Sequence, residues 1–210
     1  MRVLPILFNT EMVRAIMDGR KTCTRRSVSS RQFLGMLPDK CKNAAPDEFL
    51  KGKRMMFKPY CDMTDAELIM TAYKEPYQPG DILYVRETWK KAPNGYYYYE
   101  DWQRNDIADV TKWKPSIYMP KEAARIWLKV TDVRVERLQD ITIDEIRKEG
   151  LEPRFNVKDK FSDGIARGRF LELWNSTIKK SDLDRYGWSA NPYVFVIEFE
   201  RCEKPEDNQN

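Results

Sequence analysis

The densest group of chemically useful side chains lies between residues 19 and 26, where the sequence reads GRKTCTRR. Four of these eight residues are cationic, two carry hydroxyl groups, one is a cysteine and none is acidic. A lysine among other cations loses its proton more easily, so Lys21 could act as a general base toward the hydroxyl of Thr24. A spacing of three residues puts these groups on opposite faces of a flat strand, and catalysis therefore requires a bend between them. The alternative, a basic loop that binds phosphate, needs no bend.

A carboxylate suited to this chemistry is Glu149. The pattern Thr142-x-x-Glu145 predicts a capping box, and Gly150 predicts the end of the helix, so Glu149 belongs to its last turn. The helix dipole disfavours a carboxylate at this end by about 0.3 kcal/mol or more. Glu149 therefore serves proton transfer, pairs a lysine, or is an ordinary exposed acid at a helix end.

A third group comprises Arg86, Glu87 and Trp89 at the end of a predicted strand. An arginine and a glutamate beside a tryptophan could bind a nucleobase by stacking and by hydrogen bonds to its edge. Trp89 could equally belong to the core. Cys23, close to several cations, offers a fourth possibility, a thiol whose lowered pKa makes it a nucleophile.

The absence of histidine narrows the chemistry further. With 0 His in the chain, Ser–His and Cys–His pairs, imidazole acid–base catalysis and histidine-containing zinc sites are excluded. The four cysteines are scattered without a C-x-x-C pair, and Cys41 and Cys61 have too few companions for a metal site. We therefore expect reduced thiols, no metal and no other cofactor.

Length and charge indicate a soluble, cytoplasmic protein with one domain. The chain has 210 residues, 41% of them hydrophobic, and contains no apolar run near the roughly 18 residues of a membrane span. Its first residues do not resemble a signal peptide. The net charge is +4, but the first 60 residues carry 13 Lys/Arg against 5 Asp/Glu. This local excess suits a partner with phosphates, or it is a solvated basic face.

The hydrophobic pattern predicts mostly strands, with few helices between them. We expect strands at 3–8, 82–89, 96–99, within 124–138 and at 193–199, with a bulge near Thr131. Helices are expected after Asn9, after a Thr64 cap, at 143–149 and after a Ser162 cap. Residues 27–76 are irregular and form the predicted insertion, and residues 203–210 form a disordered tail. The predicted fold class is α+β, a mostly antiparallel β-barrel with two to three helices at its rim. Periodicity alone does not choose between this barrel and an open sheet.

Several motifs taken in order resemble the ASCH domain family. They are GRKTCTRR, the segment from Pro79 to Trp89, the segment from Trp113 to Met119, the pair Glu149-Gly150, and the closing strand after Asn191-Pro192. The long form of the chain is similar to ASCH proteins of bacteriophages and prophages. The resemblance implies a PUA-like barrel over residues 1–202, with a cleft for RNA or a modified nucleoside.

The resemblance also implies functional residues. Small family members that hydrolyse N4-acetylcytidine use a lysine, a threonine and a glutamate, which fall on Lys21, Thr24 and Glu149. An amidohydrolase acting on N4-acylated cytidine is therefore one expectation, and the alternatives are a non-catalytic RNA-binding module or a ribonuclease using the same cleft. The expected nucleotide contacts are Arg20, Arg25, Arg26, Arg86, Glu87, Trp89 and Ser116.

Overall fold

The computed structural model describes residues 1–29, 32, 64–104, 112–151 and 160–206. Most of the predicted insertion and the end of the predicted tail lie outside these residues. No helix in the described part of the chain has both the length and the apolar character needed to cross a bilayer.

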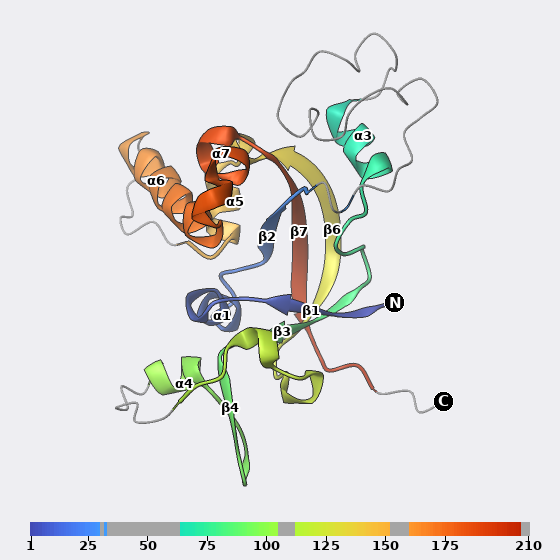
Figure 1. The fold of residues 1–210 in the computed structure, drawn as a ribbon, viewed down its shortest axis with the longest axis vertical. Coiled ribbons are helices and arrows are strands. Elements are labelled where there is room, and N and C mark those ends of the chain that lie inside the picture. Colours follow the sequence, from blue (N-terminus) through green and yellow to red (C-terminus); the bar gives the residue numbers. More distant parts are fainter. Residues whose placement is uncertain (30–31, 33–63, 105–111, 152–159, 207–210) are drawn as a thin grey trace.

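A five-stranded sheet forms the centre of the structure (Figure 1). Its order is β1-β3-β6-β7-β2, and every pairing is antiparallel except that of β1 with β3. The strands are β1 Val3–Leu7, β2 Cys23–Ser27, β3 Ile82–Arg86, β6 Trp127–Arg137 and β7 Tyr193–Cys202. The predicted α+β class and the mainly antiparallel pairing are confirmed, and β1, which contains Pro5, is an edge strand.

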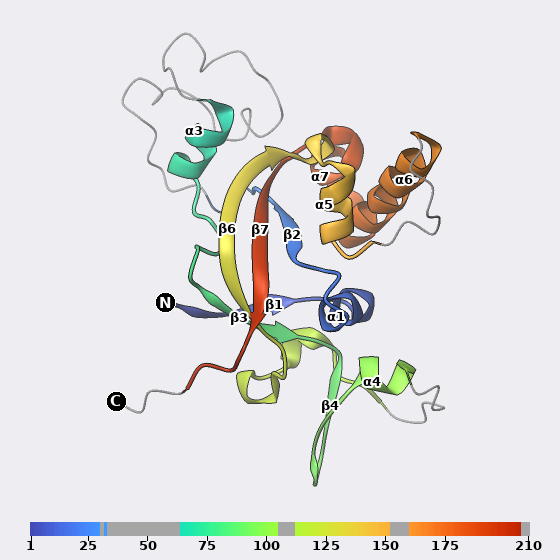
Figure 2. The same cartoon turned by 180° about the vertical axis from the view of Figure 1, so that it is seen from behind.

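The predicted barrel is wrong and the alternative, an open sheet, is found, because the sheet keeps two edges at β1 and β2. A side-chain hydrogen bond connects these two edge strands. Arg26 Nη2 in β2 donates to the carbonyl oxygen of Leu7 in β1 at 3.0 Å. The long strands β6 and β7 are strongly curved (Figures 1 and 2), and their register shifts between Val130 and Asp132, where the sequence predicts a bulge.

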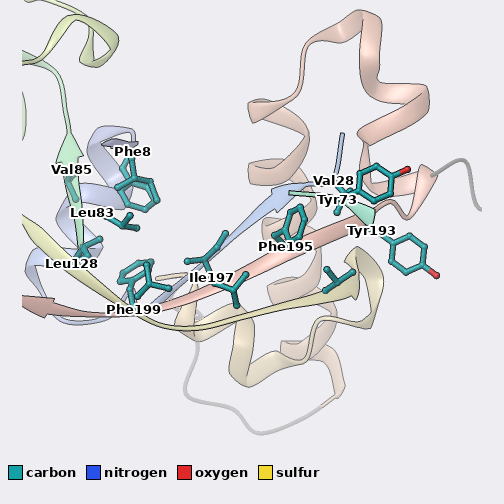
Figure 3. Close-up of a cluster of buried hydrophobic side chains, with 14 of the residues drawn as sticks. Phe8, Val28, Tyr73, Leu83, Val85, Leu128, Tyr193, Phe195, Ile197 and Phe199 are labelled. Atoms are coloured by element: carbon teal, nitrogen blue, oxygen red, sulfur yellow. The ribbon is translucent and has the colours of Figure 1, made fainter. Parts of the chain in front are cut away.

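The two faces of β7 build two hydrophobic clusters, because alternate residues of a strand point to opposite faces. Phe195, Ile197 and Phe199 pack in the larger cluster, which extends to Phe8 and Val85 (Figure 3). The opposite face contributes Val194 and Val196 to a second cluster, completed by Cys23, Leu138, Ile141, Ile146, Ala166, Phe170 and Trp174.

The described residues contain six α-helices, more than the two or three predicted. They are α1 Thr10–Met17, α3 Asp65–Ala72, α4 Tyr99–Arg104, α5 Ile143–Lys148, α6 Lys160–Thr177 and α7 Leu183–Tyr186. Side chains of Asn9, Thr64 and Thr142 cap α1, α3 and α5 as predicted. The predicted cap at Ser162 is wrong, since α6 begins at Lys160 and places Ser162 inside its first turn. Short 3₁₀ turns occur at Ser116–Tyr118, Lys121–Ala123, Leu138–Asp140, Lys180–Asp182 and Trp188–Ala190.

The strand predicted at 82–89 ends early and leads into a separate hairpin. Strand β4 covers Trp89–Ala92 and pairs with β5, Gly95–Tyr98, across the predicted Asn94-Gly95 turn. Helix α4 follows directly, so Tyr99 begins a helix instead of extending the strand. We call β4, β5 and α4 the hairpin module. It projects from the sheet at the end opposite α3 (Figures 1 and 2).

Candidate functional site

Lys21 and Glu149 meet in a buried ion pair. They form an isolated antiparallel bridge that joins the segment after α1 to the end of α5. Lys21 Nζ donates to Glu149 Oε2 at 2.6 Å, to the Cys23 carbonyl at 2.8 Å and to the Glu149 carbonyl at 3.1 Å. An ammonium group has three N–H donors, so these bonds use its whole capacity. The Lys21 side chain is 0% exposed and that of Glu149 is 5% exposed.

Two glycines make this meeting possible. Gly19, with a φ of +74°, turns the chain out of α1, and the backbone amides of Arg20 and Lys21 then donate to the carbonyl of Ala15. Gly150, with a φ of +88°, ends α5 against α1. A Cβ atom on Gly150 would lie 2.6 Å from the Cβ of Ala15 and 3.0 Å from that of Lys21. Position 150 therefore needs glycine both for its backbone conformation and for space.

Arg25 holds the second oxygen of Glu149. Its Nη1 donates to Glu149 Oε1 at 3.3 Å, and its Nη2 lies 3.2 Å from Glu145 Oε1 and 3.3 Å from Glu136 Oε2. Burial lowers the pKa of Arg25, but these carboxylates, Glu149 foremost, outweigh it and raise the pKa above its usual value. The guanidinium is therefore a permanent internal counter-ion. The Arg25 side chain, a predicted nucleotide contact, is 1% exposed and is paired with carboxylates of the protein itself.

Cys23 lies against the same carboxylate without being activated by it. Its Sγ is 3.9 Å from Glu149 Oε1. Burial, and then the negative charge of Glu149, raise the pKa of this thiol to about 12. The thiol is protonated at neutral pH, contrary to the lowered pKa that a nucleophilic cysteine requires.

Thr24 lies on the other face of β2 from Cys23 and Arg25. It pairs with Ile197 of the larger cluster, whereas Arg25 pairs with Val196 of the second. Lys21 precedes β2, which begins at Cys23, and its Nζ donates to Glu149, the carboxylate that Cys23 and Arg25 also contact. In the described structure no hydrogen bond joins the buried Thr24 hydroxyl to Lys21 or Glu149. The structure thus brings together two of the three predicted catalytic residues.

A pocket of about 250 Å³ opens beside Glu149. Three arginines from separate segments line it: Arg14 of α1, Arg20 after α1 and Arg169 of α6. Arg14 pairs with Glu100 of α4 at 3.1 Å, and Arg20 pairs with Asp18 at 2.9 Å. The remaining lining residues are Glu11, Met12, Ala15, Glu149, Gly150, Leu151 and Leu173.

Sequence reasoning found Arg20 and Glu149 but missed Arg14 and Arg169. Arg14 lies between the apolar residues whose spacing predicts α1. Arg169 lies in α6, far along the chain. Nothing in their spacing relates them to the basic stretch. They meet because α6, which packs against α5, lines the same pocket as α1.

Four predicted nucleotide contacts lie away from this pocket, at the base of the hairpin module. Arg86 Nε donates to the Met119 carbonyl at 2.7 Å. Both carboxylate oxygens of Glu87 accept from Arg125, at 2.9 and 3.0 Å. Trp89 is 4% exposed and packs against Met119, while Ser116 begins a 3₁₀ turn. None of the four lines the pocket beside Glu149, and their predicted contacts with a nucleotide remain predictions.

Within the described residues, no group of three or more cysteine, aspartate or glutamate side chains is arranged to hold a metal ion. No family model and no curated protein matches the chain. A solved structure, the ASCH domain from Lactobacillus crispatus JV V101, is similar over 95% of this chain and 79% of its own, with 9% identity and a TM-score of 0.38. A TM-score of this size carries no argument about function, so the resemblance to the ASCH family rests on the sequence motifs.

Proposed function

We propose that the protein binds RNA or a modified nucleoside in the pocket beside Glu149. The observation that carries this proposal is the convergence of Arg14, Arg20 and Arg169 from three segments on one pocket. The planar guanidinium group binds phosphate with two parallel hydrogen bonds, and phosphate contacts supply much of the affinity for nucleic acid. The lining holds three arginines against two acids, Glu11 and Glu149. Arg14 and Arg20 also pair with Glu100 and Asp18, so a bound phosphate would share these two guanidinium groups with the protein's own carboxylates.

The remaining lining suits the rest of a nucleotide. Met12, Leu151 and Leu173 offer an apolar wall for a base or a ribose. A carboxylate accepts a hydrogen bond from the exocyclic amine of cytosine, and Glu11 and Glu149 lie within the same lining. The volume of about 250 Å³ is slightly below the range of about 300–1,000 Å³ that holds larger ligands, in keeping with a single nucleoside.

Binding is tested by fluorescence anisotropy with a short labelled single-stranded RNA at several salt concentrations. We expect Arg169→Gln to weaken binding and to reduce the slope of log K against log salt by about 0.7, the value for one lost phosphate contact on a single strand. Arg147→Gln is the matched control, since Arg147 is an exposed α5 residue outside the pocket lining. Equal affinities and slopes for the two variants would contradict the proposal.

A second candidate function is hydrolysis of an N4-acylated cytidine, and the buried Lys21–Glu149 pair favours it. At a distance of 2.6 Å, transfer of one proton converts the ion pair into an amine and a carboxylic acid. The amine then takes a proton from a water molecule as the water oxygen attacks the acyl carbon, because Thr24 lies on the opposite face of β2. As the C–N bond breaks, the Glu149 acid gives its proton to the departing cytidine amine, the acyl group leaves as the carboxylic acid, and the ion pair is restored.

Incubation with N4-acetylcytidine, followed by chromatography for cytidine, tests this reaction. Lys21→Met and Glu149→Gln should abolish turnover, whereas Thr24→Ala distinguishes an attacking threonine from an attacking water. Absence of turnover by the wild-type protein, or turnover that survives Lys21→Met, would overturn hydrolysis without affecting the binding proposal. A ribonuclease would instead release RNA fragments in a reaction that depends on Lys21 or Glu149.

A further inference from the structure

The hairpin module carries a second pocket, with no lining residue in common with the first. It has a volume of about 240 Å³ and is lined by Tyr97 of β5, Trp102 of α4 and Trp113, with Lys90 and Ala92 of β4. Three of these five side chains are aromatic. Tyr97 is 37% exposed, so the hydrophobic core does not account for an aromatic residue at this position.

The rings of this pocket are held in fixed positions by their neighbours. The Trp113 ring stands edge-on to Tyr99, with centroids 5.3 Å apart, and edge-on to Trp102 at 5.8 Å. Helix α4 is tied down by the ion pair of Asp101 with Arg125 at 2.7 Å. An aromatic surface that is already ordered loses little conformational entropy when a flat ligand stacks on it.

Among the described residues, Lys90 is the one charged residue of the lining. The nearby carboxylate of Asp101 in α4 is paired with Arg125. The amines of Lys91 and Lys114 lie 5.7 and 5.1 Å from the ring centroids of Tyr96 and Trp89, in the same module. A cationic ligand, such as a methylated lysine, would meet like charge here. A ligand that combines a flat ring with a negative group would match both the rings and the lysines.

We propose that this pocket stacks a base of single-stranded nucleic acid while Lys90 contacts a neighbouring phosphate. The proposal goes beyond binding at Glu149, because the two pockets lie on different elements and neither needs the other to be occupied. Alanine substitution at a base-stacking aromatic residue costs about 1–3 kcal/mol per base, which corresponds to a roughly 5- to 150-fold loss of affinity.

The test uses Tyr97→Ala with two labelled probes, a short oligouridylate and an abasic oligomer of the same length. We expect Tyr97→Ala to weaken binding of the oligouridylate by about 5-fold or more and to leave binding of the abasic probe unchanged. Lys90→Gln should reduce the salt slope for both probes by about 0.7. Tyr118→Ala is the matched control, because Tyr118 is 71% exposed and lies outside the pocket lining.

Equal affinity of Tyr97→Ala and Tyr118→Ala for oligouridylate would overturn the proposal. Equal losses on both probes would overturn it as well, since they would show a contact with the backbone instead of a base. Displacement by an aromatic-rich peptide, with no measurable binding of oligouridylate, would assign the pocket to a protein partner. The Arg169→Gln variant keeps the two sites apart, because it reports on the Glu149 pocket and leaves all lining residues of this one intact.

Discussion

Two buried glutamates, Glu149 and Glu87, are paired with basic residues in different ways. The two oxygens of Glu149 go to two separate cations, Lys21 at 2.6 Å and Arg25 at 3.3 Å. Both oxygens of Glu87 are held by the single guanidinium of Arg125, at 2.9 and 3.0 Å. Glu149 also borders a pocket, whereas Glu87 belongs to the lining of neither pocket described above.

The difference bears on the proton transfer proposed above for Glu149. A lysine can give up its proton within a protein, whereas an arginine stays charged. The proposed proton transfer is therefore not open to the Arg125–Glu87 pair. Burial raises the pKa of Glu87, and Arg125 only partly offsets this effect. Arg125 also binds Asp101 of α4, so this pair fastens the hairpin module to the sheet.

The largest expected effect comes from breaking the Glu149 pair. Lys21→Met removes the cation whose side chain is 0% exposed and leaves a buried carboxylate with Arg25 alone. Removing one partner of a buried ion pair typically costs about 3–5 kcal/mol. We therefore expect the free energy of unfolding, measured by urea denaturation, to fall by about this amount.

The matched control is the exposed pair of Arg147 and Asp144, whose side chains are 52% and 83% exposed. Arg147→Ala should cost less than about 1 kcal/mol. Substituting both Lys21 and Glu149 by apolar residues should cost less than the two single substitutions together, because neither charge remains unpaired. A Lys21→Met protein as stable as Arg147→Ala would remove the basis of the comparison.

Gly150→Ala should cause the second-largest loss in the free energy of unfolding, because it changes the backbone next to Glu149. A Cβ atom would meet Ala15 at 2.6 Å, at a φ of +88°. The left-handed backbone costs about 1–2 kcal/mol for a non-glycine residue, and overpacking adds about 1–3 kcal/mol. Gly19→Ala is the control, because Gly19 has a φ of +74° and no atom of the described residues lies within 4 Å of the added Cβ. Equal changes in the two unfolding free energies would show that α1 can move away from position 150.

From the residues alone, a lysine partner for Glu149 is one of three alternatives, and only the ASCH resemblance groups Glu149 with Lys21 and Thr24. The capping box and Gly150 give the end of α5, and the basic stretch follows α1, so Lys21 and Glu149 lie at ends of local elements that patterns can locate. Which face of β2 carries Thr24 depends on its register with β7. That register is set by packing of segments far apart in the chain.

Barrel closure and the convergence of the pocket arginines also depend on long-range packing, which local sequence patterns do not predict. The alternation in β6 and β7 predicts long strands, and the bulge near Thr131 follows from a break in that alternation. Whether β1 then reaches β2 depends on the curvature of the whole sheet. This curvature cannot be predicted from the sequence of one segment. Arg169 enters the pocket because α6 packs against α5, far from the basic stretch in sequence.

Arg125→Met tests whether the Arg125–Glu87 pair holds the hairpin module in place. Because Arg125 is 22% exposed, we expect a loss of about 2 kcal/mol, less than for a fully buried partner. Hydrogen exchange should increase in β4 and β5 more than in β6 and β7. An increase spread evenly over the sheet would argue against a joint local to the hairpin module.

The pH dependence of this variant has a defined sign. Without Arg125, burial raises the pKa of Glu87 further above its ordinary value of 4.5. A carboxyl group with a raised folded-state pKa stabilises the fold only while protonated, and this contribution is lost as the pH rises through that pKa. The deficit of Arg125→Met relative to wild type should therefore grow between about pH 4 and pH 8. A deficit that shrinks with rising pH would mean that Glu87 finds another cation.

The smallest effect concerns Cys23, which reports on the Glu149 site without disturbing it. Burial and the charge of Glu149 raise the pKa of this thiol to about 12, so iodoacetamide near pH 8 should leave it unmodified in the folded protein and alkylate it in urea. Cys202, which is partly exposed, should react in the folded state, and mass mapping of peptides distinguishes the two. Lys21 lowers the pKa of the Cys23 thiol, so in Lys21→Met the folded protein should protect Cys23 from alkylation at least as well as the wild type does. Equal alkylation rates at Cys23 and Cys202 in the wild-type protein would mean that the Glu149 site opens readily. The Glu149 carboxylate would then be as accessible to solvent as an exposed carboxylate.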